Sequence, residues 1–312
     1  MKTTILLSCL LALPSLSFAA SDDCAKLPGQ GMESKLNSKL FKSLDNIIRF
    51  GNLKGSLETL PNDTRTVRSS SSPKWLQAVG KMITHTSSTK QVQCSLTLLS
   101  DRPDKDGIIA VTAGHCVDHW LFSKGFQIGY NQVTFTSNSG KKIKRSIVEV
   151  LKVELNPGDY AIVKLNRAIS RLDIQPLLSS YYHYSDLLND EDFSQAFDAY
   201  ATMAGYSADR GLGQKGKVLT YDRKCLLHGG GRGLKKGYCH AYDGASGGAV
   251  VVTVALDDVT GDIRDDLQLS GTTQHFFVGS IVGQRVGDNN SKTMFTENAH
   301  YSHLLDGILE AH

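Results

Sequence analysis

The sequence predicts an all-β domain of antiparallel strands with a single helix at its C-terminal end. From residue 75 onward, short runs rich in Val, Ile, Leu and Thr are separated by turn-forming residues, as in a β-barrel or a β-sandwich. Strands and helices do not alternate along this stretch, which disfavours a parallel α/β sheet. Leu304, Leu305 and Ile308 recur at helical spacing, so residues 300–309 are predicted to form a helix that packs on the strands.

The first 19 residues have the pattern of a secretory signal peptide. Lys2 supplies the positive end, and the apolar run at residues 5–13 is too short to span a bilayer comfortably. Small residues at Ser17 and Ala19 predict cleavage after Ala19. We therefore expect an exported protein, secreted to the outside or the periplasm, that is not a membrane protein after processing.

Residues 20–73 are expected to form a propeptide or an ordered N-terminal extension. Within them, residues 30–50 are predicted to be helical, because five apolar residues recur at three- and four-residue spacing: Met32, Leu36, Leu40, Leu44 and Ile47. Residues 61–73 are polar and rich in serine, which indicates a linker. The candidate processing points are Arg65, Arg68 and Lys74.

The predicted β-domain extends over residues 74–312. Its clearest strand-forming runs are residues 95–99, 107–111, 146–150, 161–165 and 249–252. Hydrophobic residues make up 40% of the 312-residue chain, which favours a folded core over disorder. A net charge of +3 without a basic stripe gives no reason to expect a nucleic-acid partner. The acidic stretch 257–266 is interpreted as a hairpin tip rather than a calcium-binding loop.

Three short segments of this domain carry a histidine, an aspartate and a serine, in that order. His115 lies in Val-Thr-Ala-Gly-His-Cys, Asp159 precedes Tyr-Ala-Ile-Val, and Ser246 lies in Gly-Ala-Ser-Gly-Gly. A serine hydroxyl is a weak nucleophile until a base takes its proton, and the base must be oriented by a third group. The sequence therefore predicts acyl transfer, with Ser246 as nucleophile, His115 as general base and Asp159 as the orienting carboxylate.

Each segment also has a purely structural interpretation. His115 could be a structural histidine beside a disulfide, and Asp159 a turn residue after Asn156-Pro157-Gly158. The small residues around Ser246 could form an ordinary Gly-rich turn. Under the catalytic interpretation, the backbone amides of Gly244 and Ser246 converge to form an oxyanion hole.

Export favours disulfide bonds between the cysteines, because disulfides persist outside the reducing cytosol. Cys9 leaves with the signal peptide, and an odd set of five remains: Cys24, Cys94, Cys116, Cys225 and Cys239. The first predicted pair, Cys94 and Cys116, flanks a strand–loop–strand. The second, Cys225 and Cys239, brackets a Gly-rich loop, so Cys24 is left over. A zinc site is the alternative, but the chain has no Cys-x-x-Cys and its histidines are scattered, so no metal or other cofactor is expected.

Together the three segments resemble the motifs of chymotrypsin-like (trypsin-like) serine proteases, and more closely those of the bacterial glutamyl endopeptidase-like branch. The resemblance extends roughly from residue 60 to the C-terminus and rests on residues 112–116, 158–165 and 244–248. It implies two six-stranded antiparallel β-barrels with the triad between them. It also implies a serine endopeptidase that cuts proteins or peptides through an acyl-enzyme intermediate. We expect this enzyme to be a monomer.

The resemblance implies positions for substrate binding as well. His240 and Tyr242 lie where the floor of the specificity pocket is expected. Gly283 is expected to pair with the backbone of an extended substrate by strand addition. The stretch 278–283 lacks the histidine that glutamate-specific members carry after the serine, so a preference for glutamate is not implied.

A second departure from the family concerns activation. Most animal members have an aspartate directly before the serine, where it pairs with the N-terminus freed on activation. Ala245 occupies this position here, although Asp243 lies nearby and could substitute. The activation mechanism is therefore not implied by the resemblance.

Two other functions compete with the endopeptidase. Gly-Ala-Ser-Gly-Gly also fits the Gly-x-Ser-x-Gly elbow of α/β-hydrolases, which would make the protein an esterase or lipase. That elbow requires a helix after the serine, whereas residues 249–254 are a β-branched run typical of a strand. The other alternative is a catalytically silent, protease-like binding protein, which the intact set of His115, Asp159 and Ser246 disfavours.

Overall fold

The computed structural model describes residues 47–49, 62–85, 91–117, 131–179, 200–228, 233–255, 273–285 and 292–312. The chain divides into two units, Met1–Lys42 and Ser43–His312, and all described residues belong to the second. The predicted signal peptide, Cys24, residues 30–46 of the predicted helix and the acidic stretch 257–266 lie outside the described residues. Among the described residues, no helix is long and apolar enough to cross a membrane.

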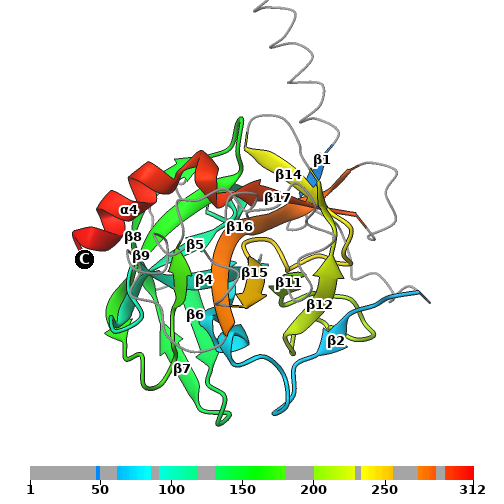
Figure 1. Cartoon of the computed structure of the whole chain (residues 1–312), viewed down its shortest axis with the longest axis horizontal. Helices are drawn as coiled ribbons and strands as arrows, with labels where there is room; N and C mark the ends of the chain where they lie inside the picture. The colour runs from blue at the N-terminus through cyan, green and yellow to red at the C-terminus, as the bar shows by residue number, and fades with distance from the viewer. Residues whose placement is uncertain are drawn as a thin grey trace, which may run out of the picture. The chain divides into compact units, whose positions relative to one another are not determined.

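Seven strands of the first half form a closed β-barrel. They are β3 (Val79–His85), β4 (Gln91–Ser100), β5 (Gly107–Thr112), β6 (Asn131–Thr136), β7 (Lys142–Arg145), β8 (Ile147–Glu154) and β9 (Tyr160–Ile169). All pairings are antiparallel: β4 lies between β3 and β5, β9 between β5 and β8, and β6 between β3 and β7. Only Ser146 separates β7 from β8, so these two form one bent strand and the ring closes with six strands. Figure 1 labels β4 to β9 of this barrel.

The second half repeats this arrangement. Its strands are β11 (Tyr200–Gly205), β12 (Thr220–Cys225), β13 (Leu227–His228), β14 (Leu234–Gly237), β15 (Ala249–Ala255), β16 (Thr273–Arg285) and β17 (Thr293–Glu297). The antiparallel order is β12–β11–β15–β16–β17–β14–β13, and only Leu226 separates β13 from β12. With β12 and β13 as one bent strand, this ring also has six strands, so the predicted pair of six-stranded barrels is confirmed.

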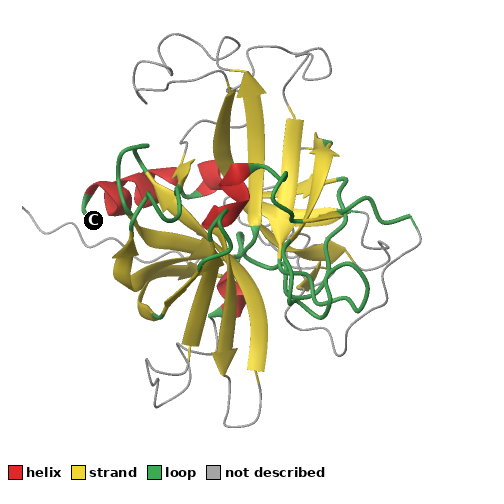
Figure 2. Cartoon of the chain, turned by 90° about the horizontal axis from the view of Figure 1, so that it is seen from below, coloured by secondary structure: helices red, strands yellow, loops and turns green. Residues whose placement is uncertain are grey.

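Strands account for nearly all the regular structure, as Figure 2 shows. In β6, alternate residues are buried, with Val133 and Phe135 directed into the first barrel, which is the period of a strand with one face on the core. A second cluster of buried side chains fills the other barrel around Phe276 and Phe295. The short strand β10 (Leu177–Ser179) pairs in parallel with both β4 and β16 and thereby links the two barrels.

The predicted C-terminal helix is present as α4 (Ser302–Glu310). Leu305 and Leu309, four residues apart, are buried in the same cluster as the first barrel's core, whereas Leu304 is 42% exposed. Tyr301, just before the helix, stacks on Tyr160 of β9 with ring centroids 4.1 Å apart. The apolar spacing therefore predicted the helix correctly, but Leu304, one of the three residues that predicted it, lies outside the buried face.

The N-terminal stretch differs from the prediction at two places. Residues 47–49, predicted to end a helix, form strand β1 (Ile47–Arg49), which pairs with β16. Two consecutive isoleucines have a high strand propensity, and pairing with a strand edge outweighs the apolar periodicity. Residues 66–67, predicted to lie in a linker, form strand β2 (Thr66–Val67), which pairs with β12.

Candidate active site

The predicted triad residues come from both barrels and meet at hydrogen-bonding distance. His115 lies in a short 3-10 helix, η3 (Gly114–Cys116), after β5; Asp159 lies just before β9; and Ser246 lies in the turn before β15. His115 Nδ1 lies 2.8 Å from Asp159 Oδ2, and His115 Nε2 lies 3.1 Å from Ser246 Oγ. Because a carboxylate only accepts hydrogen bonds, Nδ1 carries the proton and Nε2 presents a lone pair to the serine.

The fold fixes Asp159 and His115 relative to each other through the backbone as well. Strands β5 and β9 are neighbours, with Thr112 opposite Ala161, so the residues that follow β5 and precede β9 lie at the same end of the barrel. The backbone N–H of His115 donates to Asp159 Oδ1 at 2.8 Å. Asp159 thus bonds His115 through both carboxylate oxygens, which fixes the orientation of the imidazole.

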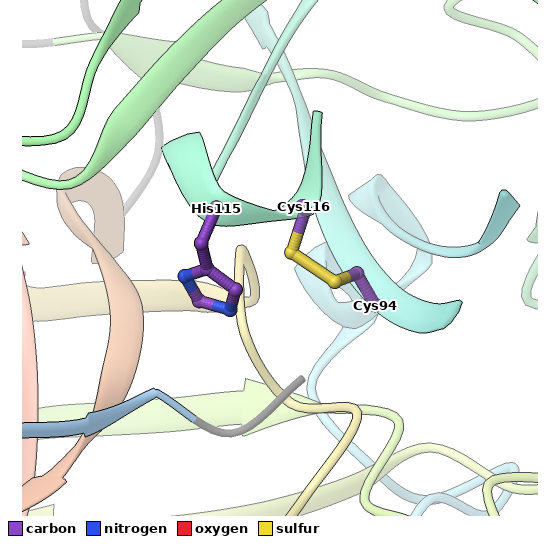
Figure 3. A group of neighbouring side chains, drawn as sticks. All are labelled: Cys94, His115 and Cys116. Atoms are coloured by element: carbon purple, nitrogen blue, oxygen red, sulfur yellow. A yellow bond between two sulfur atoms is a disulfide. The ribbon is translucent and has the colours of Figure 1, made fainter. Parts of the chain in front are cut away.

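The predicted disulfide between Cys94 and Cys116 anchors the histidine segment to strand β4 (Figure 3). The ligand atoms of Cys94, His115 and Cys116 lie within 4.8 Å of one another, as a metal site would require. Both sulfur atoms are bonded to each other, however, so neither is a thiolate that could bind a metal ion. The two cysteines therefore form a structural disulfide beside His115. The second predicted disulfide, Cys225–Cys239, is also present.

Residues 243–248, here called the nucleophile turn, are held by hydrogen bonds from Ser95 of β4. The Ser95 hydroxyl donates to the carbonyl of Gly244 at 2.9 Å, and the Ser95 amide donates to the carbonyl of Ser246 at 2.7 Å. The Ser95 hydroxyl in turn accepts from the amide of Tyr206 at 2.9 Å. A single buried serine of the first barrel therefore fixes the backbone around Ser246 on the second barrel, and no sequence motif indicated this role.

The amides of Gly244 and Ser246 are available for the predicted oxyanion hole. The carbonyl of Asp243 accepts from the amide of Ala208 at 2.5 Å, and in a planar trans peptide the Gly244 N–H then points the opposite way. No described residue accepts a hydrogen bond from the Gly244 or Ser246 amide. Gly244 has φ +86°, and a Cβ there would lie 2.5 Å from the Tyr206 carbonyl oxygen, so only glycine fits.

The side chain of Asp243 is partly buried next to this turn. Its Oδ1 is buried and has no hydrogen-bond partner among the described residues. Burial raises the pKa of Asp243 to about 7 because the charged carboxylate loses its hydration. Near neutral pH this carboxyl group is therefore only partly ionised.

His240, predicted to lie at the pocket floor, is buried in a polar network. Its backbone N–H donates to Asp222 Oδ2 at 2.8 Å, and its Nδ1 lies 3.0 Å from the Thr64 hydroxyl. The Thr64 hydroxyl donates its single proton to Asp222 Oδ2 at 2.7 Å, so Nδ1 is the donor of the Thr64–His240 bond. In the neutral imidazole His240 Nε2 is then an acceptor, and it is buried without a hydrogen-bond partner among the described residues.

Tyr242, the other predicted floor residue, is covered by an arginine from the N-terminal stretch. The Arg65 guanidinium lies 4.1 Å from the centre of the Tyr242 ring. Arg65 also forms ion pairs with Asp63 at 2.6 Å and with Asp209 at 2.9 Å, and its side chain is 1% exposed. Burial alone would raise the pKa of Asp63, but the Arg65 hydrogen bonds and charge outweigh it and lower that pKa. Residues 63–67, here called the N-terminal strap, thus pack against residues 239–242, here called the pocket segment.

The third predicted substrate-binding residue, Gly283, lies near the nucleophile on β16. The neighbouring carbonyl oxygen of Val282 lies 3.2 Å from Ser246 Oγ and is an alternative acceptor for the hydroxyl proton when that proton is not donated to His115. Gly283 pairs with Met294 of β17 on one edge of β16 and with Arg49 of β1 on the other edge. The edge predicted to receive a substrate is therefore occupied by the chain's own N-terminal strand.

Comparison with known proteins supports the fold and little more. No protein-family model and no curated protein matches the sequence. Among solved structures, the chain is similar to the scabies mite inactivated protease paralogue S-I1, with a TM-score of 0.51 and 14% identity. The match covers 76% of this chain and 96% of the mite protein. At this identity the likeness shows the fold alone, and the chain has the chymotrypsin-like all-β fold.

Proposed function

We propose that this chain is a serine endopeptidase that hydrolyses peptide bonds with Ser246 as nucleophile. The observation that carries the proposal is the unbroken hydrogen-bonded series across the two barrels, 2.8 Å from Asp159 to His115 and 3.1 Å from His115 to Ser246. Three residues from separate segments reach this geometry only because each barrel contributes its part, which disfavours an accidental cluster. The order of proton acceptor and donor along the series is the one that activates a serine hydroxyl.

The proposed reaction begins when Ser246 Oγ attacks the carbonyl carbon of the scissile bond and His115 Nε2 takes the hydroxyl proton. The carbonyl oxygen becomes an oxyanion, stabilised by the N–H groups of Gly244 and Ser246. The C–N bond then breaks, and His115 gives its proton to the leaving amine. In the second half, water attacks the acyl-enzyme with His115 again as base, which releases the new carboxylate and restores Ser246.

Rigidity of the site supports this mechanism. Asp159 accepts hydrogen bonds from both the ring and the backbone of His115, and the carbonyls of the nucleophile turn all have fixed donors. Groups that are already oriented stabilise a developing charge without reorganising during the reaction.

We extend the proposal to substrate recognition at the pocket segment. The unpartnered Nε2 of His240 is the polar group that we assign to the substrate side chain, because a buried acceptor without a bond favours a ligand that supplies one. Gly283 is assigned to the substrate backbone. Placement in the bacterial glutamyl endopeptidase-like branch rests on the three sequence motifs, and we propose no preference for glutamate.

Export belongs to the proposal as well. Two disulfides, Cys94–Cys116 and Cys225–Cys239, are consistent with a chain that folds outside the reducing cytosol. The predicted signal peptide at residues 1–19 would direct this export.

A catalytically silent, protease-like protein is the second candidate, since the similar mite protein is named an inactivated protease. The presence of all three triad residues at bonding distance favours the enzyme. An esterase of the α/β-hydrolase type is excluded by the all-β fold and by strand β15, which follows Ser246 where the elbow needs a helix.

A covalent probe separates the enzyme from the silent protein. Exported, processed protein should be labelled at Ser246 by a fluorophosphonate, as located by peptide mass spectrometry, and should cut members of a peptide library. Ser246→Ala serves as the control and should do neither. Absence of both labelling and cleavage in processed protein would refute the proposed function.

A further inference from the structure

The described form of the chain is closed to substrate. Ser246 is 0% exposed and His115 is 8% exposed. A nucleophile has to contact the carbonyl carbon that it attacks, so a substrate cannot reach Ser246 until a covering part of the chain moves. Activation therefore requires a covering segment of the chain to move away from Ser246.

Strand β16 has one edge that the barrel itself does not fill. Strand β15 pairs with β16 only as far as Ser280, opposite Ala249, and the nucleophile turn continues this edge by bonding Ile281 through Gly247 and Gly248. Beyond that point the same edge is taken by β1, with Arg49 opposite Gly283 and Ile47 opposite Arg285 (Figure 1). A strand from the N-terminal stretch thus completes an edge that would otherwise be open beside the nucleophile.

The direction of β1 is that of a substrate. It runs antiparallel to β16, and from Ile47 to Arg49 it advances from Arg285 towards Gly283. Gly283 adjoins Val282, whose carbonyl lies 3.2 Å from Ser246 Oγ. The backbone of β1 therefore approaches Ser246 in its N-to-C direction on the edge assigned to substrate binding, and it uses the main-chain bonds that an added peptide would use.

We propose that β1 is an autoinhibitory strand, which occupies the substrate edge of β16 and keeps the enzyme closed until β1 is separated from the domain. The inference rests on the proposed endopeptidase function. A strand of three residues can block this edge because it is tethered, which gives it an effective concentration of about millimolar without strong contacts. Separation requires hydrolysis of one peptide bond by water, which leaves a carboxylate on the extension and an amine on the domain.

The N-terminal strap limits where that cut can fall. Arg65 is held by ion pairs with Asp63 and Asp209, and its side chain is 1% exposed. A processing enzyme therefore cannot bind this side chain in the folded protein. Thr64 bonds His240, so a cut after Arg65 would also remove a support of the pocket segment. We therefore assign the cut to a bond after Arg49 and before Asp63, which leaves the strap on the mature enzyme.

The test uses the precursor, residues 20–312, with residues 53–58 replaced by the recognition sequence of a site-specific protease. The rate of fluorophosphonate labelling at Ser246 is measured before and after the cut, and it should rise at least tenfold. In the uncut precursor, Ile48→Pro should give a similar rise, because proline lacks the N–H and weakens strand pairing. The matched control Ser38→Pro, upstream of β1, should leave labelling slow.

The outcomes separate the two proposals. If the cut precursor is not labelled, the proposed function fails. If uncut and cut precursor are labelled at the same rate, or Ser38→Pro accelerates labelling as much as Ile48→Pro, the enzyme stands and the autoinhibitory role of β1 is refuted. N-terminal sequencing of naturally processed protein should find a start between residues 50 and 63; an active enzyme that begins at Thr66 or later would overturn the assignment of the cut.

Discussion

The nucleophile turn and the pocket segment adjoin in sequence but are held in different ways. Residues of the two barrels fix the nucleophile turn, chiefly through the backbone and hydroxyl of Ser95. The pocket segment is instead fixed by Thr64 and Arg65 of the N-terminal strap. Under the proposed function, catalysis and substrate recognition therefore depend on different parts of the chain, so variants should be able to damage one with less effect on the other.

The largest expected effect is on chemistry alone. Ser246→Ala removes the nucleophile and should lower kcat by about a million-fold, as the loss of a triad serine does. The change is small and internal, so the melting temperature should stay close to that of the parent protein. Steady-state assays on a cleaved peptide measure the loss. Retention of even a tenth of the parent activity would show that Ser246 is not the nucleophile.

Arg65→Met should act mainly on the pocket segment and on stability. Removing Arg65 takes the cationic partner away from the buried side chains of Asp63 and Asp209, which typically costs about 3–5 kcal/mol of unfolding free energy. The melting temperature should fall by on the order of 10 °C. At a temperature where the variant is folded, KM should rise more than kcat falls.

The control for Arg65 is Arg68→Met, since the Arg68 side chain bonds, among the described residues, only the Thr136 carbonyl and Asn138 near the surface. Its effect on melting should be a few degrees at most. Equal losses for the two variants, by thermal melting, would mean that the strap has no special role in holding the pocket segment.

Gly244→Ala should damage the oxyanion hole. Gly244 has φ +86°, and a Cβ there would lie 2.5 Å from the Tyr206 carbonyl oxygen. The turn therefore has to shift, and the Gly244 N–H no longer points towards the oxyanion. We expect kcat to fall by about 10²–10³-fold with KM less affected, as the loss of one oxyanion donor does. Gly140→Ala is a matched control, because Gly140 has φ +84° but open space around it; comparable kcat in both variants would contradict the role of Gly244.

The smallest expected effect is a pH-dependent gain from Asp243→Asn. Burial raises the pKa of Asp243 from 3.8 to about 7, so the folded state holds a proton that the unfolded state releases between these values. Stability from this group is therefore full below about pH 4 and is lost as pH rises to about 7. Asparagine is neutral throughout, so the variant should melt like the parent at pH 4 and a few degrees higher at pH 8.

Scanning calorimetry at the two pH values measures this difference. Asp104→Asn, at a carboxylate whose side chain is 70% exposed, is the control and should shift melting little at either pH. A gain for Asp243→Asn that is the same at pH 4 and pH 8 would rule out ionisation as its cause.

The sequence pointed to His115, Asp159 and Ser246 as partners because each lies in a short, distinctive motif. The alternation of strand runs and turns predicted a barrel or a sandwich, and the resemblance of the three motifs to a known family predicted two barrels. Pairing of Cys94 with Cys116 followed from few cysteines and their positions beside strands. The strap escaped prediction because a polar stretch such as residues 61–73 resembles a linker, and its partner Asp209 lies 144 residues after Arg65. Strand β1 was predicted as helix because apolar spacing does not show which strand edges are open elsewhere.

The position of the Cys94–Cys116 disulfide beside His115 has a consequence for the producing cell. Thiols stay reduced in the cytosol, so a newly made chain there would have its general base on a segment that no covalent bond ties to β4. The base becomes tethered only after the chain meets an oxidising environment. For an enzyme exported as proposed, the redox state of the compartment would therefore be a second safeguard against self-digestion, independent of the strand that covers the substrate edge.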